Sequence, residues 1–355
     1  VFLNLLFPSR IILCVMLIRQ ERELHGRIPM VDHKDAYASV FLSLTDVDLP
    51  VDFTNDYTKY SDFKPLAKGG KAVLQTCMDN ALGRIVVHKS LHTHIQDDVR
   101  ERRRFMREAK ISAQLQHPNT LPVYEIGRDP EGNLYFTMKR IAGLNLYQII
   151  DRLKWGFSGA QEDFNLDRLL EILLQACYAL ANAHAHGVIH RDLKPENILV
   201  GQYGEVSLVD WGVAKVWGMP NEDRTLEQRE RAESITATGQ RPGTPLYMSP
   251  EQIIGNYYVD NRTDVWAIGV MLYELLCLEV PFKGRTVHQT FDQIIHEKPA
   301  LPSHVQRNYV KRVVPSELES IAMRAMSKKP ADRQSGISEV IEQLRSFRNN
   351  KLLIS

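Results

Sequence analysis

Two short segments concentrate side chains that can transfer protons, neutralise charge and hold a metal ion. Residues 190–197 read HRDLKPEN, and residues 210–212 read Asp-Trp-Gly. Asn197 and Asp210 offer the hard oxygen ligands that Mg²⁺ prefers, so both are candidate metal ligands. Neither segment is specific alone, because an isolated Asp-Trp-Gly is usually a turn. The chemistry therefore depends on which elements position these segments.

The composition indicates a globular chain of one large two-lobed unit or two domains. It has 355 residues, 44% of them hydrophobic, and a formal net charge of +1. A charge so close to zero provides no overall field to attract nucleic acid or an acidic membrane. The four cysteines lie far apart without a CxxC pair, which excludes a zinc module and a disulfide scaffold and favours a reduced, cytoplasmic protein.

The pattern of elements changes near residue 143. Before it, strand-like runs at 63–76, 84–89, 121–127 and 133–139 surround one stretch of helical spacing at 96–116. After it, helical stretches dominate: residues 166–186, 262–277, 287–297, 316–326 and 336–347. We therefore expect an α+β chain with a small β-rich N-lobe, about 60–140, and a larger helical C-lobe, about 143–348.

The chemical residues occur in an ordered series along these elements. The series runs Lys89, Glu108, HRDLKPEN, DWG, GTPLYMSPE (243–251) and DVWAIG (264–269). In this order it resembles the eukaryotic-type serine/threonine protein kinases, including their bacterial members, over residues 60–348. The resemblance implies a bilobal protein-kinase fold that transfers the γ-phosphate of ATP, with Mg²⁺, to serine or threonine hydroxyls of protein substrates.

The resemblance assigns roles that suit phosphoryl transfer, which depends mainly on positioning and charge neutralisation. Lys89 would hold the α- and β-phosphates and Glu108 would orient it. Asp192 would accept the proton of the substrate hydroxyl, and Lys194 would contact the γ-phosphate, which favours serine or threonine over tyrosine. Asn197 and Asp210 would hold the magnesium ions.

The phosphate-binding loop departs from the family pattern GxGxxG. Residues 67–72 read AKGGKA, so only Gly69 keeps its expected place and Gly70 restores some flexibility. Ala67 and Ala72 stand where the outer glycines are usual. We therefore expect ATP to bind more weakly than in typical members.

The resemblance also places the adenine pocket between the lobes. Met138 would be the gatekeeper, and backbone groups of Lys139 and Ile141 would bond the base. Leu199 would form the floor, with Leu74 and Val87 as the roof. Val87 replaces the common alanine and Trp211 the phenylalanine of DFG.

The segment between residues 210 and 251 is long and polar in its middle. Thr236 and Thr238 form the Thr-x-Thr pair that related bacterial kinases phosphorylate, with Arg191 as the expected phosphate receiver. Autophosphorylation in trans would imply a transient homodimer. Thr244 would shape the substrate site near Asp192. The alternative is that these threonines merely populate a loop.

Two further contacts are expected inside the C-lobe. Glu251 is expected to pair with Arg333 in a buried structural ion pair. Asp264 is expected to anchor the backbone of the catalytic segment.

The ends of the chain are interpreted as extensions. Residues 1–59 are expected to be a partly disordered leader, with Met30 as an alternative natural start, and residues 349–355 a tail. The apolar residues 1–18 are divided by Asn4 and Pro8–Arg10 into runs about half as long as a membrane span needs. A weak membrane anchor stays as the alternative for this stretch.

Other readings of the same residues stay open. The AKGGKA loop would suit an ATP-binding pseudokinase that acts as a scaffold, and a small-molecule kinase could share the fold. The basic run 100–107 is read as a solvated or regulatory helix face rather than a nucleic-acid site, because acidic residues interrupt it. His88, His92 and His94 lack the partners that a metal cluster needs.

Overall fold

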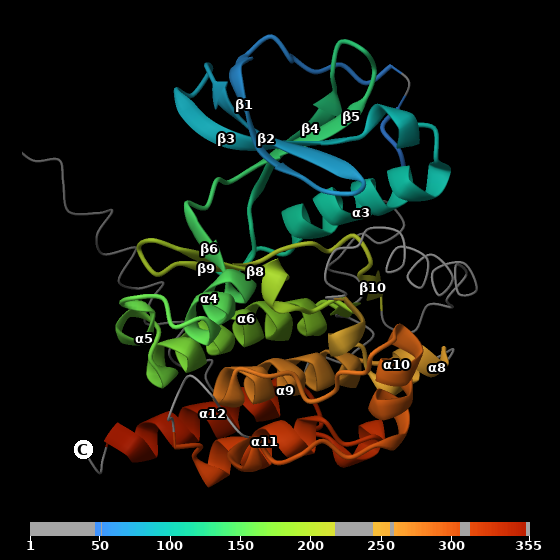
Figure 1. Cartoon of the computed structure of the whole chain (residues 1–355). Helices are drawn as coiled ribbons and strands as arrows, with labels where there is room; N and C mark the ends of the chain where they lie inside the picture. The colour runs from blue at the N-terminus through green and yellow to red at the C-terminus, as the bar shows by residue number, and fades with distance from the viewer. Residues whose placement is uncertain (1–46, 51, 217–243, 256–258, 306–312, 353–355) are drawn as a thin grey trace, which may run out of the picture.

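The computed structural model describes residues 47–50, 52–216, 244–255, 259–305 and 313–352. Figure 1 shows a β-sheet with one helix, α3, at one end of the molecule and a larger group of helices at the other. The chain crosses between the two lobes after β5, where the expected change of character lies. The expected α+β, bilobal arrangement is therefore confirmed.

The sheet of the first lobe has five antiparallel strands in the order β1-β2-β3-β5-β4. Their bounds are β1 Tyr60–Lys68, β2 Ala72–Asp79, β3 Arg84–Leu91, β4 Val123–Arg128 and β5 Leu134–Met138. Alternate residues of a strand face opposite sides, so Val86 and His88 join an aromatic cluster on one face. Val87 and Lys89 therefore face the other side.

Helix α3, Val99–Gln114, lies beside this sheet. It begins at Asp98, whose carboxylate accepts hydrogen bonds from the backbone N–H groups of Arg100 and Glu101. The apolar face of α3 packs with residues of β3 and β5 in a small core that includes Phe105 and Phe136. This packing fixes the helix that carries Glu108.

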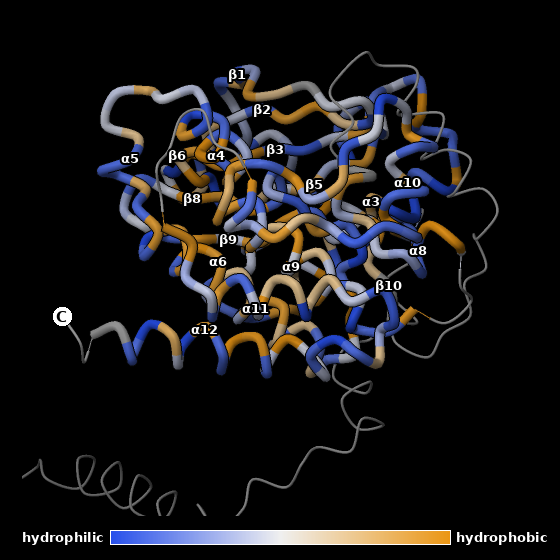
Figure 2. The backbone as a smooth tube through the Cα atoms, turned by 60° about the horizontal axis from the view of Figure 1, so that its bottom comes forward, coloured by the Kyte–Doolittle hydropathy of each residue, from blue (hydrophilic) through white to orange (hydrophobic). Residues whose placement is uncertain are grey.

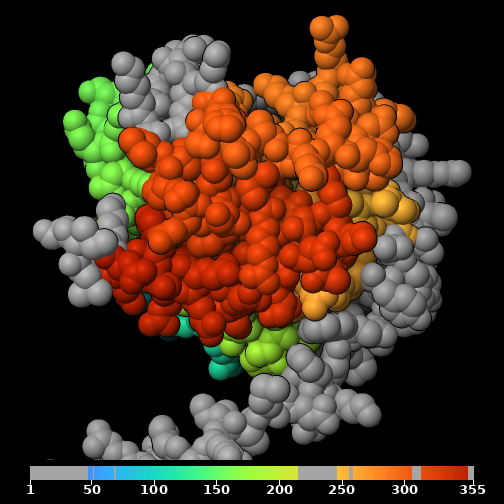
Figure 3. Space-filling view, turned by 90° about the horizontal axis from the view of Figure 1, so that it is seen from below, coloured from blue at the N-terminus to red at the C-terminus, as the bar shows by residue number. Residues whose placement is uncertain are grey.

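The second lobe is mainly helical, and its core is formed by deeply buried helices. Its helices are α4 Leu146–Lys154, α5 Ala160–Asp163, α6 Leu166–Ala185, α8 Pro250–Ile254, α9 Arg262–Cys277, α10 Val287–His296, α11 Ser316–Ala325 and α12 Ile337–Leu352. Fifteen of the sixteen residues of α9 are buried, so it is the axis of the main core. Figure 2 shows α12 alternating between hydrophobic and hydrophilic residues, and Figure 3 shows the last helices covering the base of the molecule.

Short strands flank the chemical segments at the junction of the lobes. β6 Gly143–Asn145, β8 Ile198–Gly201 and β9 Val206–Leu208 form a three-stranded sheet, and β7 Val188–Ile189 pairs with β10 Lys215–Val216. The 3₁₀ turns are η2 Thr93–Ile95, η3 Pro195–Asn197, η4 Thr244–Tyr247, η5 Pro302–His304 and η6 Pro330–Asp332. Residues 190–197 thus run from β7 to β8, and residues 210–212 follow β9.

The described part of the extension packs on the first lobe. Between residues 47 and 59, Leu49 joins the small core beside α3 and Tyr57 joins the aromatic cluster on the opposite face of the sheet. In the described ranges, no helix combines the length and the apolar character that crossing a bilayer requires.

Candidate active site

Lys89 and Glu108 meet at the centre of the first lobe. Strand β3 lies between β2 and β5, with Lys89 opposite Leu74 and Phe136. The Lys89 Nζ atom donates to Glu108 Oε1 at 2.5 Å and to Oε2 at 2.7 Å. Burial disfavours the charged amine, but the carboxylates of Glu108 and Asp210 outweigh it and raise the pKa of Lys89. Lys89 therefore stays a cation, as phosphate binding requires.

The DWG segment lies directly beside this ion pair. Asp210 has a left-handed backbone with φ 68°, and a Cβ added to Gly212 would lie 3.7 Å from Glu108 Oε2. Burial tends to raise the pKa of Asp210, but the positive charges of Lys89 and Lys194 outweigh it and lower this pKa. Asp210 is thus a carboxylate held between two lysines from different lobes.

Trp211 replaces a smaller aromatic ring without leaving the core. It is fully buried, and its ring centroid lies 4.5 Å from that of His190. It belongs to the same core as Ile111 and Leu115 at the end of α3. The indole therefore belongs to the core that reaches the end of α3.

The catalytic segment is held by a buried carboxylate of α9. Asp264 accepts hydrogen bonds from the backbone N–H groups of His190 and Arg191 at 2.9 Å each and from His184 Nε2 at 2.8 Å. Arg191 has φ 69°, which costs free energy for a residue with a Cβ. The bonds to Asp264 offset that strain, so this residue has the anchoring position predicted for it.

Asp192, Lys194 and Asn197 are brought together by the turn η3. Lys194 Nζ donates to Asp192 Oδ2 at 2.7 Å, and Asn197 Nδ2 donates to the Asp192 carbonyl at 2.9 Å. Burial opposes the charge of Lys194, but Asp192 and Asp210 outweigh it and raise its pKa. A carboxylate and a lysine cation are therefore adjacent.

The donor set for a metal ion fits magnesium. The Val209 N–H donates to the Asn197 carbonyl at 2.9 Å, which places Asp210, the next residue, beside Asn197. The Asn197 amide nitrogen is bonded to Asp192, so its oxygen is the atom available to a cation. One carboxylate and one amide oxygen leave room for phosphate oxygens and water, the arrangement common for Mg²⁺. No cluster of three or more His, Cys, Asp or Glu residues with metal-binding geometry occurs in the described ranges.

The unusual phosphate-binding loop has contacts that the sequence did not reveal. Gly69 N–H donates to the Ala72 carbonyl at 3.0 Å, and His92 Nε2 lies 2.9 Å from the Gly69 carbonyl oxygen. At the loop tip, Lys71 Nζ donates to Glu101 Oε1 on α3 at 2.6 Å. The sequence shows a lysine in this loop, which could have suggested an ion pair. Its partner, Glu101, is known only from the fold.

Three of the residues predicted to bind adenine lie in the sheet of the first lobe, and one lies in the second lobe. Val87 is buried on β3 directly opposite Met138 on β5, and Leu74 neighbours Lys89 on β2. Leu199 is half-buried on β8, in the other lobe.

The backbone groups expected to bind the base differ in their availability. Lys139 N–H donates to the Pro122 carbonyl at 3.0 Å, so it is already used within the protein. Within the described ranges, Ile141 has no backbone hydrogen-bond partner. The carbonyl of Lys139 and the backbone of Ile141 are therefore the better candidates for contacts with a base.

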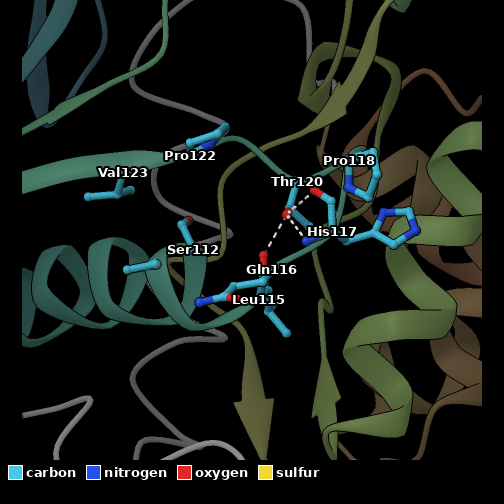
Figure 4. Close-up of a pocket in the computed structure, with 9 residues that line it drawn as sticks. Ser112, Leu115, Gln116, His117, Pro118, Thr120, Pro122 and Val123 are labelled. Carbon is cyan, nitrogen blue, oxygen red and sulfur yellow. Dashed lines mark hydrogen bonds between the residues drawn. The ribbon is translucent and has the colours of Figure 1, made fainter. Parts of the chain in front are cut away.

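A separate hollow lies behind this site, at the end of α3. Its volume is about 370 Å³. Figure 4 shows Ser112, Gln116, Pro118 and Val123 among the residues that line it. Thr120 Oγ1 donates to the Leu115 carbonyl at 2.5 Å and closes the turn after the helix. None of the predicted site residues lines this hollow.

The segment that is expected to bind substrate lies only partly within the described residues. Thr236 and Thr238 lie outside the described residues, and Thr244 begins η4 without a described side chain. Glu251 and Arg333 form the buried pair predicted, with Nη1–Oε1 at 2.7 Å and Nη2–Oε2 at 2.8 Å. This bidentate bond ties the GTPLYMSPE segment to the base of the lobe.

Comparison with known proteins identifies the family. The family model for the protein kinase domain matches residues 60–345. The chain is 34% identical over 307 residues to serine/threonine-protein kinase PknD of Chlamydia trachomatis serovar L2b, covering 81% of this chain and 31% of that protein. It is 35% identical over 279 residues to serine/threonine-protein kinase pkn3 of Myxococcus xanthus, covering 78% of this chain and 47% of that protein.

The chain belongs to the protein kinase family, as the order of its motifs indicated. PknD of Protochlamydia amoebophila is 32% identical over 296 residues, which cover 81% of this chain and 30% of that protein. The chain thus spans about a third to a half of the length of these curated relatives.

Proposed function

We propose that this chain transfers the γ-phosphate of ATP to serine or threonine hydroxyls of protein substrates, with Mg²⁺. The choice of hydroxyl is supported by Lys194 beside Asp192 and by the printed names of the relatives. The single observation that carries the proposal is the convergence of Lys89, Glu108 and Asp210 across the two lobes.

The residues have distinct roles in this proposal. Lys89, oriented by Glu108, binds the α- and β-phosphates, and the AKGGKA loop covers them. Asp192 accepts the proton of the substrate hydroxyl, and Lys194 neutralises charge on the transferred group. Asn197 and Asp210 would hold Mg²⁺, which would neutralise charge on the nucleotide phosphates. Positioning and electrostatics thus supply most of the catalysis.

The nucleotide base would enter between Val87 and Leu199, beside Met138. The carbonyl of Lys139 and the backbone of Ile141 would form the hydrogen bonds to adenine. Ala67 and Ala72 reduce the flexibility of the loop, so affinity for ATP is proposed to be modest.

Activation is proposed to depend on phosphorylation of Thr236 and Thr238. A phosphate there would bind Arg191, and Thr244 would then complete the substrate site near Asp192. Transfer between two copies would require a transient homodimer. We propose a cytoplasmic location, where ATP and protein substrates are present.

A second candidate is an ATP-binding scaffold, which the AKGGKA loop favours. Purified chain should be incubated with labelled ATP, Mg²⁺ and a generic protein substrate, beside an Asp192→Asn variant. If the chain is a kinase, the Asp192→Asn variant should lose at least about a hundredfold in kcat and still bind nucleotide. The reason is that Asp192 contacts the substrate hydroxyl rather than ATP. Equal incorporation by both proteins, or none by the wild type, would contradict catalysis.

A further inference from the structure

A short stretch before the kinase domain is attached to the helix that carries Glu108. Residues 47–59 precede the match to the family model, which begins at residue 60. The part nearest α3, residues 47–49, is termed the strap here. It contacts both α3 and β4. These two elements are otherwise connected in sequence by the turn after α3.

Asp48 is the centre of these contacts. Its Oδ2 accepts hydrogen bonds from Arg102 Nε at 3.1 Å and from Arg102 Nη2, and its Oδ1 lies 3.5 Å from Arg128 Nη2. Burial opposes its ionisation, but Arg102, the Leu49 N–H and Arg128 outweigh it and lower the pKa of Asp48. One carboxylate therefore joins a guanidinium of α3 to a guanidinium of β4.

Apolar and backbone contacts surround this carboxylate. Leu49 packs against the small core that contains Phe105 and Met106 of α3. Arg128 Nη2 also donates to the Leu49 carbonyl at 3.1 Å, and Lys110 Nζ donates to the Val47 carbonyl. The strap thus binds α3 at two places along its length, on both sides of the core contact.

The chain after the strap is itself anchored, which keeps the strap in place. Asn55 accepts a hydrogen bond from the Arg128 N–H at 3.0 Å and donates to the Arg128 carbonyl at 3.1 Å. A Cβ at Gly127 would lie 2.8 Å from the Asn55 Cγ atom, so glycine is needed for this approach. Tyr57 stacks edge-on against Tyr135, with ring centroids 5.1 Å apart.

We propose that the strap is part of the catalytic machinery and that Asp48 is a positioning residue, which acts through Arg102 and α3 to keep Glu108 bonded to Lys89. Glu108 follows Arg102 on α3 by six residues, about 9 Å along the axis. A shift of α3 would therefore lengthen the bond that orients Lys89. The inference rests on the proposed kinase function of that site.

The test compares variants of the whole chain in matched pairs. Both members of a pair carry the same type of substitution, but only one of them removes a contact between the strap and α3. Asp48→Asn is matched by Asp52→Asn, an exposed carboxylate four residues away, and Arg102→Gln by Arg103→Gln, an exposed neighbour on α3. We expect Asp48→Asn and Arg102→Gln each to lower kcat/KM for ATP by about threefold to tenfold. The double variant should lose less than the sum of the two single losses, because both substitutions remove the contact between Asp48 and Arg102. Both controls should stay within about twofold of the wild type.

A second arm separates positioning from plain stability. In a Glu108→Gln background, Asp48→Asn should no longer change kcat/KM, while its effect on Tm should persist. Full activity of Asp48→Asn, equal losses in the controls, or an undiminished loss in the Glu108→Gln background would each overturn the role of Asp48.

A third measurement keeps the inference independent of the proposed function. Hydrogen exchange of the α3 peptide should accelerate in Asp48→Asn and not in Asp52→Asn. If the wild type has no kinase activity, the proposed function fails, and unchanged exchange in α3 would then also refute attachment by the strap.

Discussion

His88 is expected to make the folded protein sensitive to acid. Its ring lies 2% exposed on β3, stacked on Tyr135 with centroids 4.8 Å apart. Neither ring nitrogen has a hydrogen-bond partner among the described residues. Burial lowers the pKa of His88 from 6.5 to about 4, although Asp129 acts weakly in the opposite direction.

The sign and size of the effect follow from proton linkage. The unfolded chain binds a proton at His88 below pH 6.5, while the folded chain stays neutral there until about pH 4. The contribution of His88 to the free energy of unfolding is therefore fully present above pH 6.5. It is lost as the pH falls from 6.5 towards 4. Each pKa unit corresponds to about 1.4 kcal/mol, so the loss at pH 4.5 is about 2.5 kcal/mol. That is a large part of the roughly 5–15 kcal/mol that stabilises a typical protein.

The assay is urea unfolding between about pH 7.5 and pH 4.5. His88→Phe keeps an aromatic ring beside Tyr135 and removes the titrating group, so it should be the more stable protein at low pH by about 2.5 kcal/mol. His288→Phe on the exposed face of α10 is the control and should retain the acid sensitivity of the wild type. Parallel pH profiles for wild type and His88→Phe would refute the argument.

Three further outcomes are expected. Glu251→Gln should lower the free energy of unfolding by about 3–5 kcal/mol in urea, because Arg333 is 2% exposed and would lose its carboxylate partner; a loss below about 1 kcal/mol would contradict a buried pair. Asp210→Ala should abolish magnesium-dependent ATP binding in calorimetry, and unchanged affinity would show that the metal lies elsewhere. Glycine at both Ala67 and Ala72 should leave KM for ATP unchanged or lower it by up to about tenfold, and a marked rise would mean that the loop holds phosphate differently.

Much of the site could be read from local sequence. Residues 190–197 and 210–212 carry their chemistry within a few positions. Their order in one series with Lys89, Glu108, GTPLYMSPE and DVWAIG indicated a protein kinase. The switch from strand to helix patterns near residue 143 indicated the two lobes, because apolar periodicity reports which faces are buried.

Contacts between distant segments were visible from sequence only by resemblance or not at all. The pairs Lys89–Glu108 and Glu251–Arg333 were expected because the family has them, whereas Lys71–Glu101 was not expected. A lysine alone does not indicate which carboxylate it will meet.

The sequence pattern and the family model both place the boundary of the domain at residue 60. Only the tertiary structure shows where the described residues between 47 and 59 pack. Residues 47–59 show no sustained helix or strand periodicity. The contacts that hold them on the first lobe are with distant parts of the chain. Asp48 is stabilised by Arg102 and Arg128, which are 54 and 80 residues away. By itself the sequence therefore indicated which residues are candidates for phosphate transfer and which lobe carries each of them. The tertiary structure decided what holds α3 in place, because those contacts join residues whose proximity is set by folding rather than by spacing.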